Sequence, residues 1–476
     1  MDLLSYKEEE VLLVFTKELC QFICRTNYED IPPDVIAVAK KAILDYIAVT
    51  MSGSQEPSGR IMGEMVKETN SPEEATVIGL RFKTNAALAA LANGTSAHTQ
   101  DYDDCLDYPK AGLAHPTAGT FSGVLTIGEK NHLSGKDLIT AYCLGVEAYG
   151  KTGQLLIRSG GAGSRGWEWT GTLGVIGSTI ALSKMLKLNE TQMINALGIA
   201  STMACSLIRN FGSFAGHIHG GNGARNGIEA VTLALKGYDC TGADVIEGRG
   251  GYYNAFADNP EIPLSEEEQK EKIAMLGNPW SLVNPSLMFK YYPCAHISHF
   301  GVWAGQMLHK KYDFDWHNIE AIEFRQPKML ARNTTPPPPE NGVQGRFSMA
   351  YCLCRSLIHD GVDFWMFKDD TVKDPDTLSL MDKLTFSVIE QEEGKLVFGY
   401  QEVVLKMKDG SELKYKIDHP KGEPQNPQSP EELEAKFRKC AAYAGYTEPA
   451  VTQIRDMVAD FENIKDITEL TALLAK

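Results

Sequence analysis

The sequence predicts a mainly α-helical protein, with a large all-helical domain from both chain ends and a smaller inserted α+β lid domain. Apolar residues recur at helical spacing from about residue 7 to 280. Strand-like alternation follows after about residue 284, and helical spacing returns at residue 429 and continues to the end. A chain of 476 residues is long enough for two cores. We therefore expect a helical domain from 1–284 and 429–476, with 285–428 inserted.

The first helical part contains clear helix signals. The segment from Ile31 to Gly53 has apolar residues such as Val35 at helical spacing, begins with prolines and ends with glycine. Asn189 and Gln192 have capping-box spacing, which predicts a helix after Asn189. Gly and Ala are abundant in these segments, so we expect the helices to pack closely.

The inserted part contains strand signals. Residues 319–327, IEAIEFRQP, are typical of a strand, and apolar residues alternating with lysines around Asp409-Gly410 predict a hairpin. Ser429 and Glu432 have capping-box spacing and predict the next helix. Because a cleft between two domains commonly holds a ligand, we expect the site there.

Composition excludes several classes of partner. A net charge of -16 argues against nucleic acid or an anionic membrane. The ten cysteines form no C-x-x-C pair and no zinc spacing, and the acidic N-terminus is unlike a secretion signal. No apolar run approaches the roughly 20 residues needed to cross a bilayer. We therefore expect a soluble cytoplasmic protein with reduced thiols.

The most informative stretch is the segment from residue 97 to 120, where four aspartates lie between two histidines. They are Asp101, Asp103, Asp104 and Asp107, bracketed by His98 and His115. Crowded carboxylates in a partly dry site raise at least one pKa, and histidine titrates near neutral pH. This pattern predicts acid–base chemistry, with a solvated acidic loop as the alternative. The glycine and distal glutamate of a calcium loop are missing, so we predict no metal.

An ordered set of motifs resembles the MmgE/PrpD family: HTQDYDDC, AHPTAGT, RGWEWTGTLGVIG, HIHGGNGARNGIEA, KYYPCAHISH and QGRFSMAYCL. The resemblance covers nearly the whole chain. It implies the two-domain fold already described and a homodimer. Members such as 2-methylcitrate dehydratase, cis-aconitate decarboxylase and iminodisuccinate epimerase act on small polycarboxylates without an obligatory metal or organic cofactor. The resemblance therefore implies proton transfer beside a carboxylate, a small anionic carboxylate substrate and no cofactor.

The resemblance implies catalytic roles for Asp101, His115, Lys290 and Tyr351. A carbanion beside a carboxylate needs a fixed cation and a base or acid within about 3 Å. We expect His115 to be that acid or base, with Asp101 orienting it. Lys290 lies among aromatic residues, where desolvation would lower its pKa, and would bind a substrate carboxylate or donate a proton. Tyr351 would offer a hydroxyl from the lid. Each role has an alternative. His115 could instead cap the next helix, Lys290 could lie on the surface, and Tyr351 could be a half-buried core residue.

Other residues are candidates for contact with the substrate: Cys105, Glu168, Arg209, His217, His219 and His299. Satisfied buried histidines and a small buried cysteine are the alternatives. Because guanidinium groups bind carboxylates through two nitrogens, four arginines are candidate carboxylate ligands: Arg165, Arg209, Arg225 and Arg346.

Two positions depart from the family pattern. Glu168 stands where the family often has histidine, and Gly216 stands where decarboxylase-like members have lysine, with His217 beside it. Glu168 would suit an amino or imino group or act as a second base; the alternative is a salt bridge to Arg165 or Arg209.

Three functions follow as hypotheses. The first is a cofactor-independent lyase, a dehydratase or decarboxylase of a small di- or tricarboxylate. The second is an epimerase of an iminodisuccinate-like substrate that exchanges an α-proton. The third is a catalytically silent carboxylate-binding paralogue.

Overall fold

The computed structural model describes residues 14–108, 112–157, 165–328, 330, 338–390 and 399–475. The side chains of residues 107–114 lie outside this description, and with them that of Asp107. The N-terminal segment, on which the expectation about a secretion signal depends, also lies outside it.

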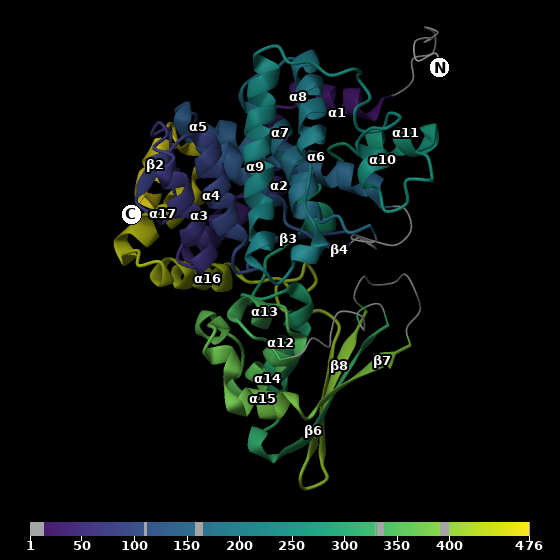
Figure 1. The fold of residues 1–476 in the computed structure, drawn as a ribbon, viewed down its shortest axis with the longest axis vertical. Helices are drawn as coiled ribbons and strands as arrows, with labels where there is room; N and C mark the ends of the chain where they lie inside the picture. The colour runs from purple at the N-terminus through teal and green to yellow at the C-terminus, as the bar shows by residue number, and fades with distance from the viewer. Residues whose placement is uncertain are drawn as a thin grey trace.

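The chain before residue 285 is mainly helical (Figure 1). Its helices are α1 Phe15–Arg25, α2 Pro33–Gly53, α3 Pro57–Glu68, α4 Ala86–His98, α5 Pro116–Lys130, α6 Gly135–Leu156, α7 Trp169–Met185, α8 Glu190–Met203, α9 Phe214–Leu235, α10 Tyr252–Phe256 and α11 Glu266–Ala274. The helices predicted from Ile31 to Gly53 and after Asn189 are both present, the second with its capping box.

Small residues let the inner helices of this part approach closely, as the composition predicts. A Cβ atom added to Gly221 of α9 would lie 2.2 Å from the carbonyl oxygen of Leu91 in α4. One added to Gly223 would lie 3.0 Å from the backbone of Gly174 in α7. Larger side chains at these positions would force the helices apart.

Two small sheets also belong to this part, although helical spacing dominates its sequence. Strands β1 Ala75–Val77 and β2 Phe82–Thr84 form a hairpin. Strands β3 Cys105–Tyr108, β4 Gly112–Ala114 and β5 Leu287–Met288 form an antiparallel sheet in the order β4-β3-β5. Because Cys105 pairs with Met288, this sheet holds the acidic stretch beside the segment that leads to Lys290.

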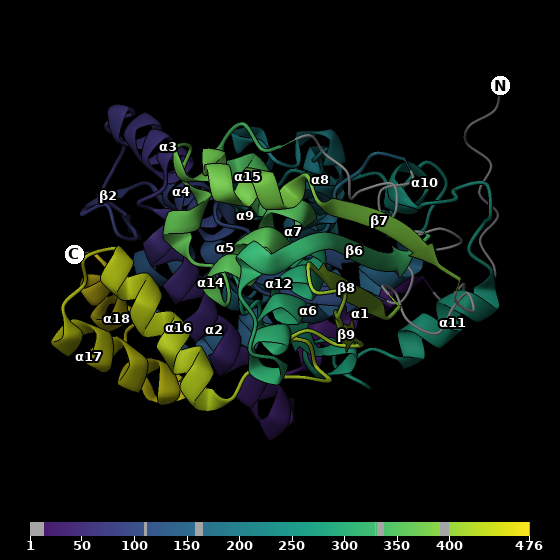
Figure 2. The same ribbon diagram turned by 90° about the horizontal axis from the view of Figure 1, so that it is seen from below.

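The middle of the chain forms a separate layered unit in the lower part of Figure 1. Its elements are α12 His296–Lys311, β6 Ile319–Pro327, α13 Gly342–Arg346, α14 Met349–His359, α15 Pro375–Met381, β7 Leu384–Ile389, β8 Gln401–Met407 and β9 Glu412–Ile417. The sheet order is β7-β6-β8-β9, with β6 and β7 parallel and the other pairs antiparallel. Figure 2 shows this sheet beside α12 and α14 from below. The predicted strand at 319–327 and the hairpin around Asp409-Gly410 are confirmed.

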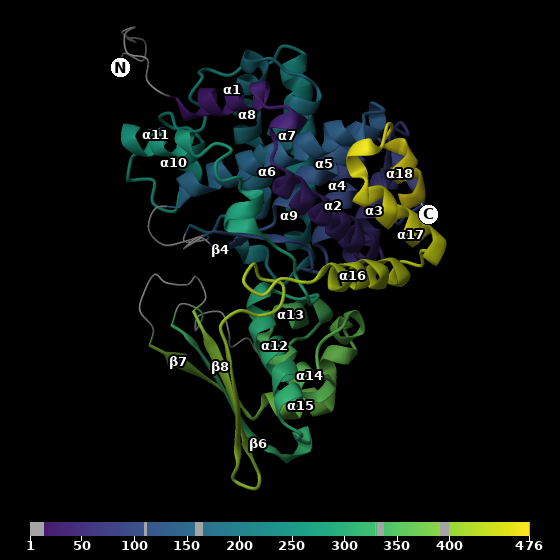
Figure 3. The same cartoon turned by 180° about the vertical axis from the view of Figure 1, so that it is seen from behind.

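The last helices return to the first part of the chain (Figure 3). They are α16 Pro430–Tyr443, α17 Glu448–Ala459 and α18 Thr468–Leu474, and α16 packs on α2. Phe437 and Ile454 belong to the same hydrophobic core as Ile43 of α2. The mainly α fold class is therefore confirmed, and we retain 285 and 428 as proposed limits of the inserted domain.

Across the part of the chain that the structure describes, no helix combines the length and apolar character needed to cross a membrane.

Candidate active site

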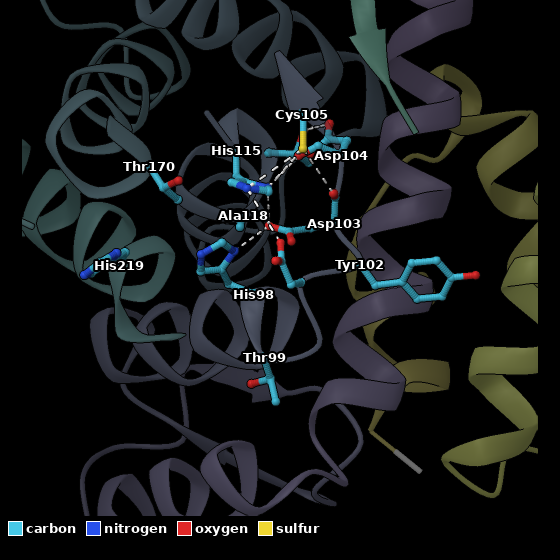
Figure 4. Close-up of polar contacts among 12 residues, drawn as sticks. His98, Thr99, Tyr102, Asp103, Asp104, Cys105, His115, Ala118, Thr170 and His219 are labelled. Atoms are coloured by element: carbon cyan, nitrogen blue, oxygen red, sulfur yellow. Dashed lines mark hydrogen bonds and ion pairs between the residues drawn. The ribbon is translucent and has the colours of Figure 1, made fainter. Parts of the chain in front are cut away.

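The acidic stretch lies in the turn between α4 and β3, inside the helical part of the protein. Asp101, Asp103 and Asp104 are all buried, and Asp101 has a left-handed backbone with φ of 49°. The stretch is therefore not a solvated acidic loop. Figure 4 shows its side chains gathered with those of His98 and His115.

One carboxylate oxygen of Asp103 lies close to two histidines. His98 Nδ1 lies 2.9 Å from Asp103 Oδ2, and His115 Nδ1 lies 3.2 Å from the same oxygen. In Figure 4, Asp103 lies between the two imidazole rings, whose centroids are 4.7 Å apart. His115 also contacts the Asp104 carbonyl oxygen through Nδ1 at 2.9 Å. Carbonyl and carboxylate acceptors at Nδ1 fix the orientation of the ring.

The contacts of His115 change two sequence-based interpretations. His115 Nε2 lies 4.0 Å from Asp101 Oδ1, so Asp103, and not Asp101, is the carboxylate that orients the ring. His115 occupies the N-cap position of α5, but its side chain makes no capping hydrogen bond. The capping alternative is therefore wrong, and the imidazole faces the carboxylates.

Electrostatics favour a protonated His115. Burial alone would lower the pKa of His115, but the negative charge of Asp103 and the neighbouring Cys105 raise that pKa well above its ordinary value. Burial would likewise raise the pKa of Asp103, and the two histidines instead hold it well below its usual range. The structure thus stabilises an imidazolium and carboxylate pair in a dry environment.

The pKa of Asp104 is shifted in the opposite direction from that of Asp103. Burial raises the pKa of Asp104 to about 8, although a hydrogen bond from the Thr117 hydroxyl opposes the shift. Thr117 also lies 2.6 Å from the hydroxyl of Tyr142. This is the raised carboxyl pKa that crowding of carboxylates predicts.

Lys290 reaches the acidic stretch from the segment after β5. Its Nζ forms an ion pair with Asp101 and donates a hydrogen bond of 2.9 Å to the Asp101 carbonyl oxygen. The side chain is buried, so the alternative of a surface lysine is wrong. The expected lowering of its pKa is also wrong: burial alone would lower the pKa, but the Asp101 carboxylate outweighs burial and raises it. Lys290 is therefore a fixed cation.

Cys105 lies beside the same imidazole. Its Sγ is 3.6 Å from His115 Nδ1 and 3.9 Å from Nε2, and the residue is buried. The Cys105 thiol is therefore in contact with the His115 imidazole, and its role toward a substrate stays a prediction.

Glu168 and His219 form a second pair near the acidic stretch. Glu168 is the N-cap of α7 and accepts from the backbone N–H groups of Thr170 and Gly171 at 2.8 and 3.2 Å. His219 Nδ1 of α9 lies 3.0 Å from Glu168 Oε2. Although burial opposes ionisation, His219 and the cap lower the pKa of Glu168 to about 2. Figure 4 shows Thr170 and His219 on neighbouring helices beside the cluster.

The predicted salt bridge from Glu168 to an arginine is wrong. Arg165 donates to the carbonyl oxygens of Ala255 and Ala257, and Arg209 is exposed. His219 supplies the partner because α9 packs against the start of α7.

Three predicted site residues are bonded elsewhere. His217 Nδ1 lies 2.8 Å from the Ser58 hydroxyl, and burial lowers the pKa of His217 to about 3. His299 Nε2 lies 3.1 Å from the carbonyl oxygen of Tyr292. Tyr351 belongs to a lid core, and its hydroxyl donates to the Met366 carbonyl oxygen. The described polar contacts of His299 and Tyr351 are thus with the lid, and their roles toward a substrate stay predictions.

Two of the candidate arginines have protein partners. Arg225 donates to Asn226 and lies 3.8 Å from Glu229. Arg346 is buried and pairs with Glu56 at 3.2 Å. Contact with a substrate carboxylate remains a prediction for both.

Sequence reasoning did not include His98 and Asp103 among the site residues. Both lie in the acidic stretch, but their role depends on the turn after α4, which brings residues five positions apart within 2.9 Å. The available signal was the acidic stretch itself, in which His98 and Asp103 stand five positions apart.

The same three side chains could be considered as metal ligands. His98, Asp103 and His115 offer ligand atoms within 4.8 Å of one another. However, both Nδ1 atoms lie at hydrogen-bond distance from one oxygen, and the Lys290 ammonium acts on His115 as a nearby positive charge. A cation would have to displace those hydrogens against that charge, so the arrangement fits hydrogen bonding better than coordination.

The chain is similar to known proteins over nearly its whole length. The MmgE/PrpD N-terminal domain matches residues 17–265, and the MmgE/PrpD C-terminal domain matches residues 292–463. A cis-aconitate decarboxylase of Aspergillus terreus is 27% identical over 96% of this chain and 95% of its own length. A cis-aconitate decarboxylase of Mus musculus is 26% identical over 92% of this chain and 89% of its own, and one of Homo sapiens is 26% identical over 92% and 90%.

Proposed function

The chain belongs to the MmgE/PrpD family, and we propose that it is a lyase acting by acid–base chemistry next to a carboxylate of a small di- or tricarboxylate. Among lyase reactions we favour decarboxylation, because relatives named cis-aconitate decarboxylase align with nearly the whole chain. The observation that carries the proposal is the buried His115 with a raised pKa, near the fixed cation Lys290.

A decarboxylation would use these groups as follows. The C–C bond to the leaving carboxylate breaks, its electron pair stays on carbon, and CO2 departs. The positive charge of Lys290 stabilises the developing negative charge, and the His115 imidazolium gives its proton to the carbon. Asp103 holds His115 in its protonated form before this step, and water returns the proton afterwards. A dehydration would need His115 in its neutral form to take the proton beside the carboxylate, and the raised pKa of His115 disfavours that form.

The direct test is turnover of a panel of di- and tricarboxylates that includes cis-aconitate. Release of CO2 identifies a decarboxylase, and a new conjugated alkene identifies a dehydratase. His115→Ala should lower kcat by at least roughly 100-fold. His309→Ala is the matched control, because this lid histidine also bonds a backbone carbonyl oxygen but lies outside the cluster. Full activity of His115→Ala would refute the proposal.

A second candidate is epimerisation of an iminodisuccinate-like substrate. The observation that favours it is Glu168, a buried carboxylate with a pKa of about 2, which adds negative charge beside the cluster. An ionised glutamate disfavours a third substrate carboxylate and favours an amino or imino group. In D2O an epimerase would exchange the α-proton with no CO2 and no alkene formed. A silent paralogue would instead bind a carboxylate, seen as a rise in melting temperature, without any turnover.

We also propose that the protein is a cytoplasmic homodimer. Three apolar residues at the start of α9 and just before it, Leu207, Phe211 and Phe214, are each more than 40% exposed. A second copy would cover such a surface. Light scattering of the purified protein tests the dimer, and Phe211→Asp should shift it to a monomer.

A further inference from the structure

Two buried cations join the two chain segments that carry Asp101 and Lys290. One segment contains Gln100 and Tyr102, on either side of Asp101, and the other runs from Lys290 to Pro293. The segments are 189 residues apart in the sequence and approach through the Asp101 ion pair with Lys290.

The first cation is Arg346, which comes from α13 in the lid. A single guanidinium nitrogen, Nη1, donates to the Gln100 carbonyl oxygen at 3.2 Å and to the Pro293 carbonyl oxygen at 3.0 Å. Each of these carbonyl groups belongs to one of the two segments. Arg346 therefore holds the segments together just before Asp101 and just after Lys290.

The second cation is Lys436, which comes from α16 near the C-terminus. Its Nζ donates to the Tyr102 carbonyl oxygen at 2.8 Å and to the Lys290 carbonyl oxygen at 2.9 Å. The Tyr102 side chain points away from the cluster in Figure 4, and its hydroxyl donates to the Tyr291 carbonyl oxygen at 3.1 Å. Lys436 thus joins the same two segments on the other side of the Asp101 and Lys290 pair.

Each cation has its own carboxylate in the helical part of the chain. Arg346 Nη2 lies 3.2 Å from Glu56, and Lys436 Nζ lies 2.6 Å from Asp45 of α2. Burying a charge is costly unless it is paired and hydrogen-bonded, and apolar side chains would stabilise a fold as well. Two buried cations that both bridge the same pair of segments therefore indicate a requirement for geometry at that point.

We propose that Arg346 and Lys436 are positioning residues that together fix the Asp101 and Lys290 ion pair in its reactive geometry. The lid supplies Arg346, and the C-terminal helices supply Lys436. Two parts of the chain that are distant from Asp101 in the sequence therefore complete the site. This clamp of Arg346 and Lys436 holds Asp101 in its left-handed backbone conformation, which the surrounding contacts must maintain. The inference rests on the proposed function only for its effect on turnover.

The test compares two variants with matched controls. Arg346→Lys keeps the charge but cannot reach all its acceptors, and its control is Arg355→Lys, an equally buried lid arginine that pairs with Asp374. Lys436→Met removes the ion-pair partner of Asp45. Its control is Lys151→Met, which also removes one partner of a buried ion pair, although Glu147 keeps its hydrogen bonds from the Gly277 and Ser281 backbone N–H groups. The controls reproduce the loss of a buried ion pair without touching either segment.

Two readouts are measured on the full-length protein. The first readout is turnover of a carboxylate that the wild type accepts as substrate. In both variants kcat should fall roughly 10- to 100-fold, while KM changes less than about threefold. In the controls kcat should stay within about twofold of the wild type. Hydrogen–deuterium exchange of the peptide from residue 98 to 106 should speed up in both variants and not in the controls. The second readout needs no substrate.

The outcomes separate the two proposals. Faster exchange in the variants supports the clamp even if wild-type protein turns over no carboxylate, which would refute only the proposed lyase. The clamp is overturned if Arg346→Lys and Lys436→Met change the exchange rate and kcat no more than their controls do. If Lys436→Met does not fold, Arg346→Lys decides the result with its own control.

Discussion

At the scale of single residues, the site is a set of buried acids and bases, each held by a specific partner. Asp103 forms ion pairs with both His98 and His115, and Asp101 forms one with Lys290. Because these contacts are dry, each one shifts a pKa in a direction that fits an acid, a base or a fixed charge.

We predict that Asp103→Asn weakens His115 as an acid. The Asp103 charge opposes the effect of burial on the pKa of His115, so its removal should lower that pKa and deprotonate His115 at neutral pH. The basic limb of the pH profile of kcat should move to lower pH, and kcat at neutral pH should fall by at least roughly tenfold.

The control for this variant is Asp315→Asn. Asp315 also pairs with a histidine, His317 at 2.6 Å, but on the protein surface. Its pH profile should match that of the wild type. Identical profiles for Asp103→Asn and the wild type would contradict the role assigned to Asp103.

We predict that removal of metal leaves activity intact. His98, Asp103 and His115 are hydrogen-bonded to one another near the Lys290 ammonium, which disfavours a divalent cation. Dialysis against a strong chelator, followed by elemental analysis and assay, should leave kcat within about twofold. Loss of activity that one particular metal ion restores would show that these side chains coordinate a catalytic ion.

At the scale of secondary structure, element ends place the site residues. His98 ends α4, His115 precedes α5 and Glu168 caps α7. The short sheet β4-β3-β5 then brings the segment before Lys290 beside Cys105. Polar side chains at element ends can face one another without interrupting the apolar helix faces.

We predict that the Glu168 cap stabilises the fold in a pH-dependent way. The folded-state pKa is lowered from 4.5 to about 2, so the stabilisation is present above pH 4.5 and is lost as the pH falls toward 2. Glu168→Gln should lower the free energy of unfolding by roughly 3 kcal/mol at neutral pH, as an upper value. Urea unfolding at a series of pH values measures this difference.

The matched control is Glu229→Gln, which removes a half-exposed glutamate near Arg225. Its effect should stay within about 0.5 kcal/mol at every pH. If the difference in free energy of unfolding between Glu168→Gln and the wild type were the same at the lowest pH as at neutral pH, the charge of Glu168 would not be what stabilises the cap.

At the scale of the whole molecule, both chain ends build one core and the middle of the chain builds another. Phe437, Ile454 and Leu470 belong to the large core with residues of α2. The second core lies between α12, α14 and the sheet of the inserted part. The site lies where these parts meet, because Arg346 comes from one and Lys436 from the other.

We predict that a chain ending at residue 428 does not fold. Each large apolar side chain lost from the core removes roughly 1.5–3 kcal/mol, and domains are stable by only about 5–15 kcal/mol. The truncated chain should be insoluble, and co-expression of residues 429–476 should restore soluble protein. A chain ending at residue 475 is the control. A soluble truncated chain with native near-ultraviolet circular dichroism would contradict the shared core.

Features that depend on residues close together in the chain could be predicted without the fold. Helical spacing from Ile31, the capping boxes at Asn189 and Ser429, the hairpin around Asp409-Gly410 and the burial of an acid–base stretch could all be predicted. Each follows from local periodicity, from capping or from the composition of the flanking segments.

The partner of each acid and base depends instead on the fold. The fold pairs His115 with Asp103, Glu168 with His219 and Lys290 with Asp101. The last pairing raises the pKa of Lys290, which desolvation alone would lower. A pKa depends on charges a few ångströms away, and those charges belong to residues far apart in the chain. Their positions follow from how helices pack, which local sequence patterns do not encode.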